Sequence, residues 1–160
     1  ADSLEEVLRI AKETAMPTHN HPQGVIGAQA VAGATFIARK AAPDGDEASC
    51  KGEIKDLLQK HCGYDMQRTV AEIRPSYAFD ETCQGSVPEA LTCFLEAACF
   101  EDAVRKAVSL GVDADTQACI AGAPAGALWG VPGPVRERAM DLLAPEMLKV
   151  LAAFAKRFGW

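Results

Sequence analysis

Two acids and a hydroxyl stand close together in the last third of the chain. Asp113, Asp115 and Thr116 follow Gly111, and no acid, lysine or arginine occurs between Thr116 and Val135. Carboxylate and hydroxyl oxygens are the ligands that hard divalent cations such as Mg²⁺ prefer. A bend at Gly111 would turn both carboxylates toward one ion. The segment therefore predicts part of a magnesium site, and it equally fits a helix in which Asp115 is only the N-cap and Asp113 is solvated.

A second polar segment lies near the N-terminus, where Thr18-His19-Asn20-His21 precedes Pro22 and a nearly uncharged stretch. The free N–H groups and the dipole at a helix start attract anions, so the segment predicts a place for a phosphate. The alternative is that Thr18 or Asn20 caps the helix while the histidines lie exposed. Zinc is the weaker interpretation of the two histidines, because no regularly spaced third ligand follows them.

A third segment, Gln84 to Glu89, places a glycine turn before another helix start. Gly85 and Ser86 could present backbone N–H groups and a hydroxyl to a ribose or phosphate. Ser86 and Glu89 also match a capping box, which would give both a structural role and would place Pro88 in the tolerant first turn. A nucleophilic role for Ser86 is disfavoured, because no histidine is placed to activate it.

The elements that would position these segments are all helical, and no convincing strand appears. The turn Pro43-Asp44-Gly45 is expected to close the second helix. About seven or eight helices are expected, packed around the two least charged ones. Caps, apolar spacing and Gly or Pro stops predict these helices over roughly residues 3–15, 23–38, 46–63, 86–98, 100–110, from 115 onward, 135–143 and 145–158, with a short helix at 67–73 as a further candidate.

Composition sets the class of protein. The chain of 160 residues is 49% hydrophobic, which predicts a single domain over residues 1–160 with a real core. The net charge of −6 and the lack of a Lys/Arg cluster argue against a nucleic-acid partner. The longest uncharged run is interrupted by Gly and Pro, which predicts a buried helix rather than a membrane span. Six cysteines without a C-x-x-C pair predict free thiols in a reduced, cytoplasmic protein.

Three ordered motifs carry a resemblance to a known family. They read THNHPQGVIGAQAVA at 18–32, CQGSVPEAL at 83–91 and FEDAVRKAVSLGVDADT at 100–116. Together they resemble the ADP-ribosylglycohydrolase family, over roughly residues 3 to 131 and over the C-terminal part of a typical member. The resemblance implies an orthogonal all-α bundle around two Mg²⁺ ions. It also implies hydrolysis of the bond between ADP-ribose C1″ and its acceptor.

The resemblance also assigns residues. The family's N-terminal Thr-Asp-Asp segment and its catalytic glutamate have no counterpart here, so a truncated member with at most a partial Mg²⁺ site and impaired hydrolysis is expected. No catalytic residue is assigned. The alternatives are a non-catalytic ADP-ribose-binding module and a homo-oligomeric structural protein, since uncovered apolar helices favour a dimer. The motifs match metal ligands at Asp113, Asp115 and Thr116, and ADP-ribose contacts at His19, Gly85 and Ser86.

Overall fold

The structure is a computed structural model that describes residues 1–42 and 45–158. It divides into two compact units, Ala1–Gly130 and Val131–Trp160. The described residues form nine α-helices and one π-helical turn, without a strand, so the all-α prediction is confirmed and the helices outnumber the expected seven or eight. Within these described residues, no helix has the length and apolar character needed to cross a membrane. One family domain over residues 1–160 stays a prediction.

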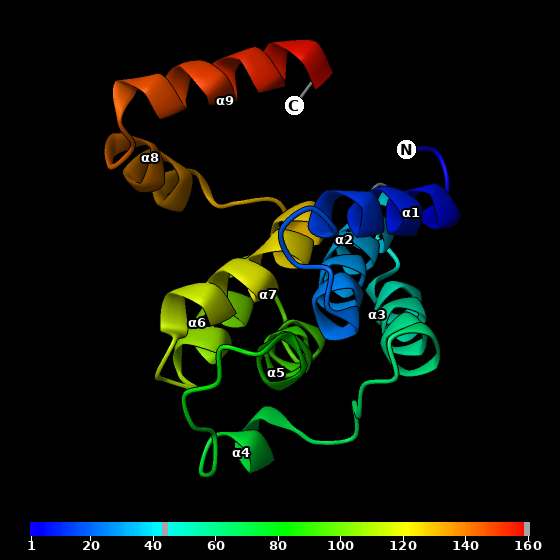
Figure 1. The fold of residues 1–160 in the computed structure, drawn as a ribbon. Coiled ribbons are helices and arrows are strands. Elements are labelled where there is room, and N and C mark those ends of the chain that lie inside the picture. The colour runs from blue at the N-terminus through cyan, green and yellow to red at the C-terminus, as the bar shows by residue number, and fades with distance from the viewer. Residues whose placement is uncertain (43–44, 159–160) are drawn as a thin grey trace. The chain divides into compact units, whose positions relative to one another are not determined.

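The helices of the first unit agree with the expected ranges to within a few residues. Gly63, with φ +72°, ends the third of them as expected, after a π-helical turn that was not expected. The turn expected at Pro43 and Asp44 lies outside the described residues. Figure 1 shows the elements in order: α1 (Leu4–Ala15), α2 (Pro22–Ala41), α3 (Glu47–Asp56), η1 (Leu57–His61), α4 (Val70–Ile73), α5 (Cys83–Leu95), α6 (Phe100–Val108) and α7 (Ala114–Trp129).

The start of α1 shows how a local pattern directs the chain. The Ser3 hydroxyl accepts a hydrogen bond from the backbone N–H of Glu6 at 3.2 Å, as a capping box requires. The Glu6 carboxylate, however, accepts from the N–H of Asp2 at 3.0 Å. Ser3 is therefore the N-cap of α1, while the carboxylate bond that would complete a capping box is made with the N–H of Asp2 instead of Ser3.

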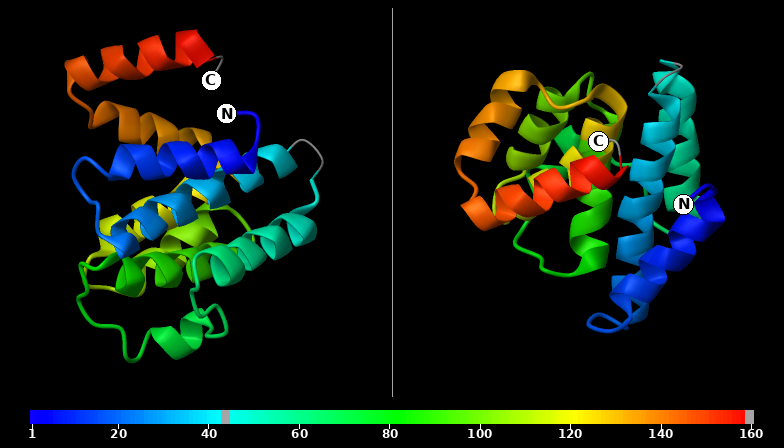
Figure 2. Two further views of the ribbon diagram at one scale, coloured as in Figure 1. Left: turned by 45° about the vertical axis from the view of Figure 1, so that its right-hand side comes forward. Right: turned by 90° about the horizontal axis from the view of Figure 1, so that it is seen from above.

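The core of the first unit is centred on α5. Every residue from Ser86 to Phe94 is buried, because α2, α6 and α7 all pack against this helix (Figure 1). The two helices that were expected at the centre, α2 and α7, also pack against each other, and α3 lies alongside α2 (Figure 2). The expectation that these two helices form the centre is therefore incomplete, because α5 is more deeply buried than either.

The second unit consists of α8 (Gly133–Asp141) and α9 (Pro145–Phe158), and neither helix has a buried residue. Helix α9 is amphipathic. It has Glu146 in its first turn and Lys156 and Arg157 in its last. Two helices of this length enclose little volume, so large apolar side chains stay exposed. The exposed ones are Val135, Met140, Leu142, Met147, Val150, Phe154 and Phe158.

All six cysteines are free thiols. Cys50, Cys62 and Cys93 are buried in the core, where they pack as small hydrophobes. Burial raises the pKa of Cys62 to about 11 and, with the charge of Glu96 adding to it, the pKa of Cys93 to about 12. These two thiols therefore stay protonated near neutral pH and have a structural role.

Candidate functional site

The predicted bend before α7 is present. Gly111 has φ +80°, and Val112 follows it with φ +58°. A left-handed conformation costs a β-branched residue about 1–2 kcal/mol, so the chain is strained at this bend. Asp113 then takes the N-cap position without a capping bond from its side chain. The alternative in which Asp115 caps this helix is therefore wrong, because Asp115 lies inside the first turn.

The side chains of the three predicted metal ligands are not bonded to other described residues. Asp113 is half-buried, whereas Asp115 and Thr116 are exposed. None of the three side chains has a hydrogen bond or ion pair among the residues that the structure describes. Two carboxylates and a hydroxyl are a donor set that fits Mg²⁺, with water filling the remaining positions. Elsewhere in the described chain, too, no three His, Cys, Asp or Glu side chains gather closely enough to hold a metal.

A hydrogen-bonded pair of polar side chains, one buried and one half-buried, lies beside Asp113. The side-chain amide of Gln117, one helical turn after Asp113, donates a hydrogen bond to the phenol oxygen of Tyr77. Gln117 is fully buried, and its Oε1 atom has no partner among the described residues. A buried acceptor without a donor costs free energy, so its presence needs an explanation. Such a group commonly marks a place where water, an ion or a ligand completes the structure.

Acidic side chains surround the Tyr77 phenol. Burial raises the pKa of Tyr77, and the negative charges of Glu89, Asp80 and Asp113 raise it further. The phenol therefore stays protonated and can donate a hydrogen bond near neutral pH. Its position links the start of α7 to the loop before α5, which are distant in sequence.

A cavity of about 220 Å³ lies beside this phenol, lined among others by Asp80, Gly85 and Glu89. The Asp80 carboxylate packs so closely on Gly85 that a Cβ atom there would overlap it. Hydrogen bonds from the Thr82 side chain and backbone lower the pKa of Asp80, and the backbone N–H bond is 2.7 Å long. The buried Glu89 carboxylate forms an ion pair with Arg68. The wall of this cavity is therefore polar and includes two carboxylates.

The start of α5 corrects the third prediction. Thr82 caps this helix through a 3.2 Å bond from the N–H of Gly85, so the capping box expected at Ser86 and Glu89 is wrong. Ser86 is buried inside the first turn, and its hydroxyl donates to the Thr82 carbonyl at 2.8 Å. The N–H groups of Gly85 and Ser86 also bond to the Thr82 carbonyl. Pro88 consequently lies beyond the first turn, inside the helix.

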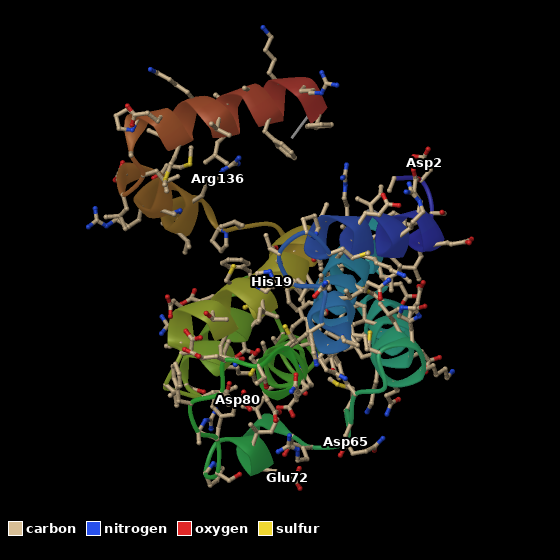
Figure 3. The ribbon with its side chains drawn as sticks, viewed as in Figure 1. Asp2, His19, Asp65, Glu72, Asp80 and Arg136 are labelled. Carbon is tan, nitrogen blue, oxygen red and sulfur yellow. The ribbon has the colours of Figure 1, made fainter. Side chains whose placement is uncertain are left out.

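His19 lies at a separate place. It is exposed, and its Nδ1 atom lies 2.8 Å from the Thr18 hydroxyl. The N-cap of α2 is His21, whose ring nitrogen accepts from the N–H of Gln23 at 3.3 Å, so the capping role expected for Thr18 or Asn20 is wrong. In Figure 3, His19 and Asp80 appear on opposite sides of α5.

A cavity of about 380 Å³ joins the starts of α2 and α5, and His19 and Cys83 both line it. The two helices touch at Gly27, where a Cβ atom would lie 2.9 Å from the Cβ of Cys83. Ile120 of α7 closes the wall. The lining is mostly apolar apart from His19 and two threonines. It therefore suits an uncharged part of a ligand better than a charged group.

The structure thus brings Gly85 and Asp113 to the same neighbourhood through Tyr77, whereas it places His19 on a separate cavity. Tyr77 and Gln117 were not predicted, because their contact joins residues 40 positions apart. One signal for Gln117 was available, since it is a polar residue in an uncharged helix, four residues after Asp113.

Comparison with known proteins identifies one family. A family model described as ADP-ribosylglycohydrolase matches residues 1–159. The match extends beyond the expected range of 3–131 and includes α8 and α9. No curated protein and no solved structure gives a significant match.

Proposed function

Since the chain belongs to the ADP-ribosylglycohydrolase family, we propose that it binds ADP-ribose or a related nucleotide next to the first turn of α7. The family supports a hydrolase-like function. The finer part of the proposal is a Mg²⁺-dependent hydrolysis of the ADP-ribose glycosidic bond that is weak in this chain alone. Two acids and a hydroxyl at one helix start offer few protein ligands to a metal. Ligand binding is therefore expected to be retained even where hydrolysis is slow.

Asp113, Asp115 and Thr116 would hold the Mg²⁺ ion. Their hard oxygens are free of other partners among the described residues, which supports this assignment. A bound Mg²⁺ would polarise ribose oxygens and lower the pKa of a water molecule. The Tyr77 phenol, which remains protonated, can donate a hydrogen bond to a ligand oxygen in the same neighbourhood.

His19, Gly85 and Ser86 are the proposed contacts to ADP-ribose. Gly85 lines the polar cavity, where the Asp80 carboxylate packs against it, and His19 lines the apolar one. Ser86 supports the same turn through its bond to the Thr82 carbonyl. The ligand would therefore follow the first turn of α5, with its ribose toward Asp113.

One observation carries the proposal. The buried Oε1 atom of Gln117 has no hydrogen-bond partner among the described residues, and the Asp113 side chain one helical turn before it makes no capping bond. A protein that needed this region only for packing could replace the polar pair at positions 77 and 117 with apolar residues at little cost in stability. A buried acceptor beside free carboxylates instead fits a site that is completed by a ligand or by ordered water.

The test is calorimetric titration of ADP-ribose with and without millimolar Mg²⁺. Mg²⁺ is expected to tighten binding about tenfold, because two ligands of one site are coupled by about 1–3 kcal/mol. The Asp113→Asn variant is expected to lose this gain. Glu5→Gln is the control, since it removes one exposed acid from α1. Absence of ADP-ribose binding, or an unchanged Mg²⁺ effect in Asp113→Asn, would contradict the proposal.

A single-turnover assay with an ADP-ribosylated substrate separates hydrolysis from binding. Slow release that requires Mg²⁺ is the proposed behaviour. Mg²⁺-dependent binding without release favours the second candidate, a non-catalytic ADP-ribose-binding module. The carboxylates of Glu89, Asp80 and Asp113 around Tyr77 would repel a diphosphate, so ADP-ribose is expected to bind more tightly with the cation in either case.

We further propose that the chain is a cytoplasmic homodimer that pairs through α9. Val150 is 68% exposed on this helix, which favours burial against a second copy. An antiparallel pair would place Glu146 beside Lys156 of the other copy. Sedimentation is expected to show a dimer that Val150→Arg converts to a monomer, and a wild-type monomer at high concentration would contradict this.

A further inference from the structure

A cavity of about 310 Å³ lies away from the proposed ADP-ribose contacts, between α3, the segment that joins η1 to α4, and α5. Asp65 and Glu72, both labelled in Figure 3, mark that segment and the short helix after it. Three of the chain's basic residues line the cavity, Lys51, Lys55 and Arg68. This concentration of positive charge is unusual for a chain with a net charge of −6.

The two lysines lie one turn apart on α3, so they share a face. The Lys51 ammonium donates to the Ala97 carbonyl at 2.5 Å and lies 5.2 Å from the centre of the Trp129 ring. The Glu47 carboxylate lies 4.0 Å from the same ammonium and forms an ion pair with it. These contacts hold the Lys51 charge in place and neutralise part of it. Lys55 is half-buried and has no hydrogen bond or ion pair among the described residues, so its ammonium is available to a ligand.

Arg68 contributes from another wall of the cavity. One of its terminal nitrogens is held by the Glu89 carboxylate, and the side chain is 48% exposed. A guanidinium has five N–H donors, so others remain free for a second anion. The single acid that lines the cavity is Glu96, and its Oε1 atom already accepts from the N–H of Val70 at 2.9 Å.

We propose that this cavity binds the phosphate of a small organic molecule about the size of a mononucleotide. Cations from separate elements suit an anion with several oxygens, which a phosphate offers in more directions than a carboxylate. Met66 and Leu95 line the same cavity and suit an apolar or planar body. The inference does not rest on the proposed ADP-ribose site, although Arg68 lines both this cavity and the one at Tyr77.

The test uses AMP, adenosine and inorganic phosphate as probes in calorimetry on the full chain without Mg²⁺. AMP is expected to bind more tightly than adenosine and than phosphate, and added salt should weaken it. Lys55→Gln is expected to raise the dissociation constant for AMP about tenfold, the effect of losing one charge-assisted hydrogen bond. Lys60→Gln is the matched control, because Lys60 is 74% exposed and pairs with Asp56.

Amide chemical shifts then locate the ligand. AMP should perturb residues 51–55, 66–69 and 92–96. Shifts confined to 18–24 and 113–117 would overturn the inference while leaving the proposed function intact. Equal affinity for AMP and adenosine would also overturn it, as would an equal loss in Lys55→Gln and Lys60→Gln.

Discussion

Replacing Phe94 with alanine is expected to lower the free energy of unfolding by about 3–5 kcal/mol. The side chain is fully buried on α5, and its ring lies 5.5 Å from that of Trp129. Truncation removes the transfer free energy of the ring and leaves a cavity that the surrounding helices fill only in part. Because α2, α6 and α7 all pack on α5, the loss should affect the whole first unit.

Urea denaturation measures this effect, and Phe79→Ala provides the matched control. Phe79 is 59% exposed in the loop before α5, so its truncation should change stability by no more than about 0.5 kcal/mol. A similar loss in both variants would contradict the central position of α5. An unchanged slope with denaturant would show that the folded state keeps its compactness in Phe94→Ala.

The helical ranges were predictable because Gly and Pro interrupt the chain at their ends. Pro22 begins α2 and Gly63 ends η1, each for a backbone reason that is visible in the sequence. Uncharged stretches likewise identified α2 and α7 as core helices. The greater burial of α5 was not predicted, although Glu89 is its one charged residue, because burial also depends on which helices surround it.

The caps show where local patterns fail. Ser86 and Glu89 match a capping box, but Thr82 lies earlier and starts the helix. Glu89 is then free to pair with Arg68, a contact across 21 residues that no local rule anticipates. A tertiary ion pair has replaced the local bond that the pattern favoured.

The candidate site was predictable in its residue types and less so in its neighbours. The bend at Gly111 was expected because glycine adopts positive φ readily, and Asp113 follows it as predicted. Tyr77 lies in a loop whose sequence contains no periodic signal. Its contact with Gln117 depends on the packing of α5 against α7, which the sequence alone does not specify.

Truncating Arg68 to alanine is expected to lower the free energy of unfolding by about 2 kcal/mol. Removing one partner of a buried pair costs about 3–5 kcal/mol, because it leaves a buried charge alone. The Glu89 side chain is only 10% exposed, but Arg68 is 48% exposed, so water can reach the vacated space and reduce the loss. Arg9→Ala is the control, since Arg9 pairs with Glu13 at 2.7 Å on the surface, where about 0.5 kcal/mol is expected.

A double-mutant cycle identifies the cause of that loss. Glu89→Gln removes the buried charge, so adding it to Arg68→Ala should restore part of the stability that the single variant loses. Additive losses would contradict the cycle, because they would mean that Arg68 stabilises the fold through contacts other than Glu89. Arg68 lines both the cavity at Tyr77 and the cavity at Lys55. AMP binding should therefore remain weak in the double variant even where stability returns, since the neutral amide relieves the buried charge but does not replace the lost guanidinium.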